Sequence, residues 1–202
     1  MNAAGQGSQL VINDGEFEGQ EMAVMAFDGA EVVINGGDFE TIDNAVIGTN
    51  GSAGRGNNKI TINNATLTGG TTTDGYEACG IYVANNDEVT VGSNVEINVV
   101  NGCGILMRGG NVTVKKGVKI ITTTDKGSDF TGYVGDNKTK MSQSGIIYHE
   151  TANYPGKAGM KLTVESGVKI SSIVHSIEIL SNEETPNVLI RQGDFSPAYP
   201  EE

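Results

Sequence analysis

The chain has 202 residues with 29 Gly, 4 Pro and no Trp, and 37% of its residues are hydrophobic, a length and a composition that fit one folded domain and argue against disorder. Its formal net charge of −12 would repel phosphates, so we expect no nucleic acid partner. No apolar run reaches the roughly 18 residues of a membrane-spanning helix, so we expect no membrane insertion.

One short pattern, an apolar–any–apolar strand followed by a turn and another apolar position, recurs seven times along the chain. An apolar residue at every second position is the period of a β-strand with one buried face. A three-residue strand cannot bury that face alone, so the repeats are expected to stack on one another. The seven strands are 10–12, 32–34, 60–62, 89–91, 112–114, 162–164 and 188–190.

A further short strand, usually a small residue followed by apolar ones, lies between successive copies. These segments are 23–25, 45–47, 80–83, 104–107, 145–148 and 176–179. With the strand that follows each turn, every repeat has three short strands separated by Gly and Asn turns. The sequence therefore predicts an all-β, single-stranded right-handed parallel β-helix of about seven coils, forming one domain over residues 1–202. An antiparallel β-sandwich, the alternative, does not explain why the same turn residues return about every 25 residues.

The turns fall into two lengths. In the first three copies and the last, the next apolar residue comes five positions after the strand, whereas in the other three it comes four positions after and continues as Val-x-Ile. The five-position residues are Phe17, Phe39, Leu67 and Phe195, and the four-position residues are Val95, Val118 and Val168. Asn13, Asn35 and Asn63 follow equivalent strands, so we expect their side chains to stack from coil to coil.

The Val-x-Ile-x-Gly-Gly-x-Phe phrase at residues 32–39 resembles the repeats of right-handed parallel β-helix proteins in the pectate-lyase-like superfamily. It is most similar to the glycine-rich versions in bacteriophage virion fibres and tailspikes and in bacterial surface proteins. The resemblance covers about residues 9–196 and implies the architecture, but the same scaffold serves lyases, hydrolases, adhesins and spacers. The catalytic residues of its enzymes have no matching positions here, so no catalytic residue is carried over.

The one large irregularity is a step of 50 residues between two copies. We expect two loop excursions, at about 122–143 and 149–160, that leave the same coil and bring Tyr133, Tyr148, His149 and Tyr154 into one neighbourhood. Aromatic rings with polar tips suit stacking on a sugar or contact with a protein. These four residues are the candidate ligand-binding residues; surface insertions without a role and a subunit contact are the alternatives.

Other chemistry-bearing residues favour structural interpretations. Cys79 and Cys103 precede equivalent strands in consecutive coils and are interpreted as small buried thiols, with a disulfide left open. His175 shares that position, and its alternation with Ile177 predicts that it faces inward. Glu16 and Asp38 share a turn position and are expected to form a solvated acidic edge. We expect no metal and no cofactor.

Exposed strand edges at the two ends of a solenoid need covering. We expect a partner chain, self-association as a homo-oligomer, or further polypeptide at one end or both. The expected function is that of a non-enzymatic structural or adhesive module whose loops bind a glycan or a receptor protein. Because the first residues lack a secretion signal, a virion surface is favoured over a bacterial cell surface. The alternative is a polysaccharide-degrading enzyme, a lyase or a glycoside hydrolase, on the same scaffold.

Overall fold

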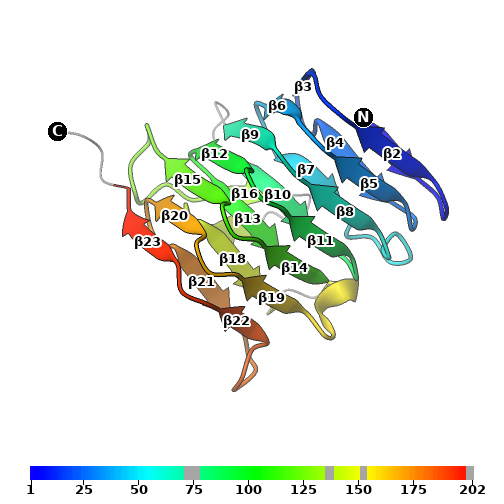
Figure 1. Ribbon diagram of the computed structural model, residues 1–202. Helices are drawn as coiled ribbons and strands as arrows, with labels where there is room; N and C mark the ends of the chain where they lie inside the picture. The colour runs from blue at the N-terminus through cyan, green and yellow to red at the C-terminus, as the bar shows by residue number, and fades with distance from the viewer. Residues whose placement is uncertain (71–77, 135–138, 151–153, 199–202) are drawn as a thin grey trace.

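The chain winds into a right-handed parallel β-helix of seven coils (Figure 1). The computed structural model describes residues 1–70, 78–134, 139–150 and 154–198. Each coil contributes one strand to each of three seven-stranded sheets, and every neighbouring pair within these sheets is parallel. The predicted architecture is therefore confirmed.

We call the three faces sheets A, B and C. Sheet A contains β1 (Asn2–Ala4), β4 (Val24–Phe27), β7 (Ala45–Thr49), β10 (Cys79–Val83), β13 (Cys103–Met107), β18 (Ile146–His149) and β21 (Ile177–Leu180). Sheet B contains β2 (Gln9–Ile12), β5 (Glu31–Ile34), β8 (Lys59–Ile62), β11 (Glu88–Val91), β14 (Asn111–Val114), β19 (Lys161–Val164) and β22 (Val188–Ile190). Sheet C contains β3 (Glu16–Gly19), β6 (Gly37–Thr41), β9 (Ala65–Gly70), β12 (Glu96–Val100), β15 (Lys119–Thr123), β20 (Lys169–Ser172) and β23 (Asp194–Pro197).

Equivalent residues lie directly above one another. In sheet B, Thr61, Thr90, Thr113 and Thr163 pair in register on the outer side. In sheet C, the inward column runs from Phe17 through Phe39 and Leu67 and then continues with isoleucines; those partners are Ile97, Ile120 and Ile170. In the copies with the shorter turn, the Ile of Val-x-Ile thus takes the place of Phe, and the Val comes two residues before it.

Asparagine side chains line the corners, and the expected ladder is found between Asn13 and Asn35, whereas the next side-chain pair joins Asn64 and Asn94 and does not include Asn63. Asn35 Nδ2 donates to Asn13 Oδ1 at 3.0 Å, and Asn94 Nδ2 donates to Asn64 Oδ1 at 3.1 Å. Six residues other than glycine have positive φ among those described, and five of them are asparagines. Asn tolerates this left-handed conformation better than most residues, so the same residue supplies both the bend and the ladder.

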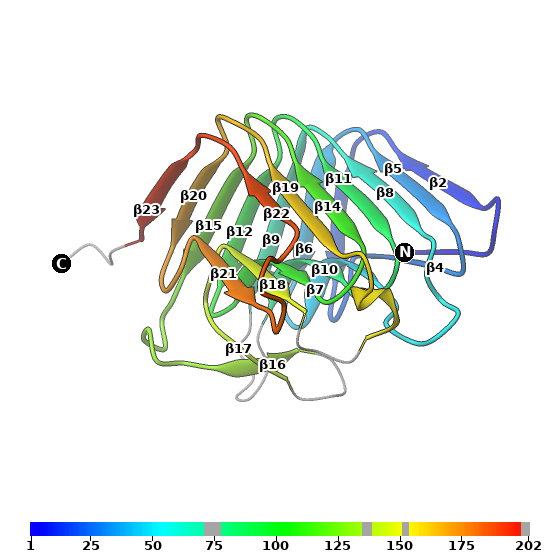
Figure 2. The same ribbon diagram turned by 90° about the horizontal axis from the view of Figure 1, so that it is seen from below.

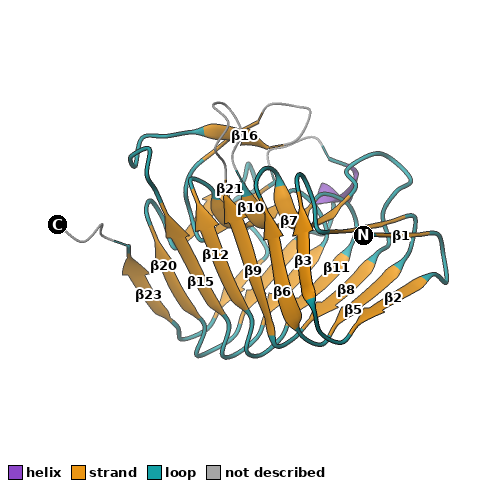
Figure 3. Ribbon diagram, turned by 90° about the horizontal axis from the view of Figure 1, so that it is seen from above, coloured by secondary structure: helices purple, strands orange, loops and turns teal. Residues whose placement is uncertain are grey.

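Two features of the fold have no counterpart in the repeat pattern. The strand β1 lies at residues 2–4, although the sequence pattern begins only at about residue 9. The excursion between β15 and β18 contains an antiparallel hairpin of β16 (Gly132–Val134) and β17 (Thr139–Met141), which lies outside sheet A (Figures 2 and 3).

The second excursion contains the 3-10 helix η1 (Pro155–Lys157). Among the residues that the structure describes, no helix has the length and apolar character to cross a membrane.

Candidate ligand-binding cavity

The middle strands of sheet A are buried on both of their faces. The inner side of the sheet contributes to the main core, and its outer side carries a second apolar cluster of Ala45, Cys79, Tyr82, Ala84, Cys103, Leu106, Met141 and Ile147. Every residue of β7, β10 and β13 is buried as a result. The loop excursions account for this second layer, because Met141 and the half-buried Tyr154 pack onto it from them.

The excursion after β18 folds back toward the N-terminal coils. Gly110 N donates to Gly156 O at 2.9 Å, and a Cβ on Gly156 would overlap the backbone of Asn85. Tyr154 then lies against the loop after β7, where a Cβ on Gly51 would be 2.5 Å from Tyr154 Cε1. Close approach at these two glycines sets the position of the Tyr154 ring.

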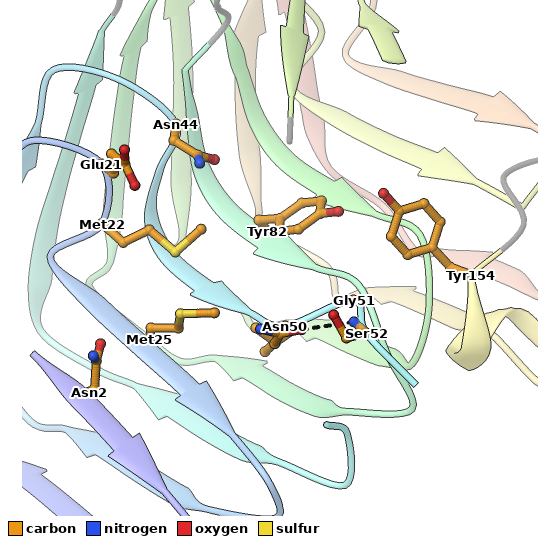
Figure 4. Close-up of a pocket in the computed structure, with 11 residues that line it drawn as sticks. Asn2, Glu21, Met22, Met25, Asn44, Asn50, Gly51, Ser52, Tyr82 and Tyr154 are labelled. Carbon is orange, nitrogen blue, oxygen red and sulfur yellow. Dashed lines mark hydrogen bonds between the residues drawn. The ribbon is translucent and has the colours of Figure 1, made fainter. Parts of the chain in front are cut away.

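A cavity of about 620 Å³ opens beside this ring, on the outer side of sheet A; we call it the tyrosine cavity. Figure 4 shows Tyr82 and Tyr154 on one side of it, Met22 and Met25 on another, and the Asn50–Ser52 loop below. Ser52 N donates to Asn50 Oδ1 at 2.8 Å, which closes that loop. The lining residues are Asn2, Glu21, Met22, Met25, Asn44, Thr49, Asn50, Gly51, Ser52, Tyr82 and Tyr154.

Behind the two tyrosines lies Arg108, which is fully buried. Its guanidinium carbon is 4.8 Å from the centroid of the Tyr154 ring and 5.7 Å from that of Tyr82. Its Nη1 donates to the Tyr154 hydroxyl, and its Nη2 is 3.9 Å from the sulfur of Met141. Burial raises the pKa of Tyr82 far above its usual value despite the opposing charge of Arg108, so Tyr82 is a neutral phenol at physiological pH.

His149 lies next to Arg108 on the same face. Met107 and Tyr148 pair in register, which makes Arg108 and His149 the following neighbours. Burial lowers the pKa of His149, and the Arg108 charge lowers it further, while Glu178 opposes the shift. The imidazole is therefore neutral near pH 7. Its Nδ1 is buried without a hydrogen-bond partner in the described part of the chain.

The structure does not bring the four candidate residues that were predicted from the sequence together in one site. Tyr154 lines the tyrosine cavity, and His149 is linked to it through Arg108. Tyr148 instead points into the main core, where it is fully buried and its hydroxyl donates to Met160 O at 3.3 Å, so its ring is not on the surface offered to a ligand. Tyr133 belongs to β16, and its side chain lies outside the described residues.

Two of the cavity's main residues were not among those candidates. Tyr82 and Arg108 lie in segments that the repeat pattern assigns to ordinary strands and turns. Their alternation with the inward residues Ile81 and Met107 was the available signal, because it places both side chains on the outer side of sheet A. Nothing in the local sequence indicates that this outer side is covered.

The remaining candidates have structural positions. Cys79 and Cys103 pair in register and are buried thiols that are not joined in a disulfide, as interpreted. The expectation that His175 faces inward is wrong: Cys79 and Cys103, at the same position of earlier coils, pack in the outer cluster of sheet A, and His175 itself is exposed. Glu16 and Asp38 pair in register and are exposed. Within the described ranges, no three His, Cys, Asp or Glu side chains are grouped so that they could hold a metal ion.

Comparison of the chain with protein-family models, with curated proteins and with solved structures gave no significant match. The chemistry of the cavity itself therefore carries the functional argument.

Proposed function

We propose that this protein is a non-enzymatic β-helix module that binds a glycan in the tyrosine cavity. The observation that carries the proposal is the pair of Tyr82 and Tyr154 rings beside a hollow lined by the amides of Asn2, Asn44 and Asn50. The repeats resemble those of virion fibres and bacterial surface proteins. This resemblance supports a location at a virion surface as the first choice and at a bacterial cell surface as the second.

The composition of the lining suits a polyhydroxylated ligand. The apolar face of a sugar ring packs on an aromatic ring, whose polar tip can contact the hydroxyls. Amide side chains both donate and accept hydrogen bonds, so they match hydroxyl groups without demanding a charge. A volume of about 620 Å³ lies within the usual range of small-ligand sites.

The scaffold also favours binding without reorganisation. Tyr82 extends from β10, which is paired on both sides by β7 and β13, and Gly51 and Gly156 fix the approach of the Tyr154 segment. A preorganised site loses little side-chain and loop freedom when its ligand binds.

A glycan array with the purified protein, followed by calorimetric titration of the best ligand, tests the proposal. We expect Tyr154→Ala to weaken binding by about tenfold or more, roughly 1.4 kcal/mol, because the stacking surface is lost. Phe130→Ala is the matched control, since Phe130 is an aromatic residue of the other excursion that does not line the cavity; its affinity should stay within about twofold. An array without any hit, or equal affinities of Tyr154→Ala and the unmodified chain, would contradict the proposal.

The enzymatic alternative predicts a different result. Glycoside hydrolases use two carboxylic acids at the scissile bond, and Glu21 is the single carboxylate among the described residues that line the cavity. Incubation with acidic and neutral polysaccharides, followed by assays for reducing ends and unsaturated products, separates the two. We expect no turnover, and release of either product would overturn the non-enzymatic assignment.

We also propose that a second copy of this chain stacks on the open end formed by β21, β22 and β23. There, Ile179, Ile190 and Phe195 are 42%, 42% and 38% exposed, although their register places them in the inward columns of the three sheets. The last coil shares its turn length and its Phe with the first one. The rings of Phe17 and Phe39 stack with their centroids 4.9 Å apart. Phe195 of one copy, placed on Phe17 of the next copy, would continue this stack.

A further inference from the structure

Arg108 carries a charge that has no counter-ion among the described residues. The ion pairs found there are Arg55–Asp28, Lys115–Glu165 and Lys119–Glu96, all on partly exposed side chains. Arg108 is fully buried. A guanidinium stays protonated in a protein, and a buried charge is costly unless it is paired and hydrogen-bonded.

The hydrogen-bond donors of Arg108 are only partly used. Nη1 donates to the Tyr154 hydroxyl, Nη2 faces the Met141 sulfur at 3.9 Å, and Nε is buried without a partner in the described chain. A thioether is a weak acceptor. The two tyrosine rings stabilise the cation through cation–π contacts, which offset only part of the desolvation cost.

His149 adds a second unused group at the same place. It is next to Arg108 in register, and its buried Nδ1 has no partner within the described ranges. Of the two, the Arg108 guanidinium attracts an anion, and the neutral His149 adds a hydrogen-bond donor in the tautomer that carries its proton on Nδ1. Glu178 is the acidic group that acts on His149, and it accepts hydrogen bonds from Ser142 and Ser144.

We infer that the tyrosine cavity selects glycans that carry a carboxylate and that Arg108 binds this carboxylate. Tyr82 and Tyr154 both contact Arg108 and line the cavity, so the guanidinium lies directly behind the cavity wall. The Tyr154 hydroxyl occupies the place of an acceptor oxygen on Nη1, and a ligand carboxylate that takes this place would replace a phenol oxygen by a charged one while the Tyr154 ring stays beside the cavity. The planar fork of a guanidinium matches the two oxygens of a carboxylate.

This inference rests on the proposed glycan binding, and the test uses two probes that differ in one group, methyl glucuronide and methyl glucoside. We expect the glucuronide to bind the unmodified chain at least tenfold more tightly in calorimetric or NMR titrations. Arg108→Met should reduce this preference, measured as the ratio of the two affinities in the same variant, to within about twofold. Arg55→Met is the matched control, since Arg55 also lies over an aromatic ring, Phe27 at 5.5 Å, but on the surface; it should keep the preference.

A measurement on the unmodified chain guards against a variant that fails to fold. We expect methyl glucuronide to raise the melting temperature more than methyl glucoside does at equal concentration and ionic strength. Equal shifts and equal affinities would overturn the role of Arg108 while leaving glycan binding intact. A preference that persists in Arg108→Met would also overturn it, whereas a glycan array without hits removes the proposed function itself.

Discussion

At the scale of single residues, buried amides connect successive coils. Asn58 Oδ1 accepts hydrogen bonds from the backbone N–H groups of Gly29 and Ala30 at 3.0 and 3.1 Å. Its Nδ2 donates to Asp87 Oδ1 at 2.7 Å and to Arg55 O at 2.9 Å. One side chain thus ties the corner after β4 to the corner before β11, with its polar atoms satisfied as burial requires.

We predict that Asn58→Ala lowers the free energy of unfolding by about 2–3 kcal/mol, because it leaves buried N–H groups without acceptors. Denaturant titration followed by circular dichroism measures the change. Asn13→Ala is the control, since Asn13 belongs to an exposed ladder, and it should cost no more than about 0.5 kcal/mol. Equal losses in the two variants would show that burial of the amide does not matter.

His149 gives the fold a dependence on pH. Burial and Arg108 hold its pKa below the ordinary 6.5, so the unfolded chain takes up the proton first as the pH falls. The contribution of a neutral His149 is therefore complete above about pH 6.5 and is lost as the pH drops through the lower pKa of the folded state. We predict that the stability of the unmodified chain relative to His149→Gln declines from pH 7.5 to pH 5. The melting temperatures of the two proteins are measured at each pH. If they change in parallel from pH 7.5 to pH 5, His149 is not the source of the pH dependence.

At the scale of the elements, a column of three glycines lies at the start of β10, β13 and β18, three neighbouring strands of sheet A. A Cβ on Gly80, Gly104 or Gly145 would overlap the Cγ2 of Ile97, Ile120 or Ile170, respectively. The absent side chains let sheets A and C meet at a narrow corner, and each glycine accommodates the isoleucine opposite.

We predict that Gly104→Ala lowers the free energy of unfolding by about 1–3 kcal/mol, because the added methyl group overpacks this corner. The matched control is Gly70→Ala at the end of β9, where the nearest atom to a new Cβ among the described residues is Val100 Cβ at 3.9 Å. Thermal unfolding of the two variants measures the difference. Equal melting temperatures would mean that the corner has room for a side chain.

The sequence was sufficient to predict the coil strands because their apolar period repeats in register, as Thr61, Thr90 and Thr113 show. It did not predict β1 or the hairpin β16–β17, because neither belongs to a repeat that buries a face. The two-sided burial of the middle strands of sheet A depends on where the excursions fold back, which Gly51 and Gly156 determine through contacts distant in sequence. Tyr82 and Arg108 were missed for that reason.

At the scale of the whole molecule, the open coil of β21, β22 and β23 predicts concentration-dependent association. Light scattering on the chain of 21.1 kDa should give a mass that rises with concentration. Ile190→Asp should abolish the rise, because it places a charge in the inward column at the end of the stack. Val100→Asp, at a side-chain position that is similarly exposed but lies in the middle of the rod, should not. A constant mass of one chain over a hundredfold range of concentration would contradict end-to-end stacking.

The claim that the tyrosine cavity is the binding site is tested most directly by closing it reversibly. Ser52 is an exposed lining residue, and the native thiols of Cys79 and Cys103 are buried, so a Ser52→Cys variant can be modified at one position with a bulky disulfide reagent. Modification of the Ser52→Cys protein should abolish its affinity for the best glycan on the array, and a reductant should restore that affinity. The control is a Thr66→Cys variant, whose cysteine lies on the outer side of sheet C. The same modification of this variant should not change its affinity. Unchanged affinity in the modified Ser52→Cys protein would show that the ligand binds elsewhere.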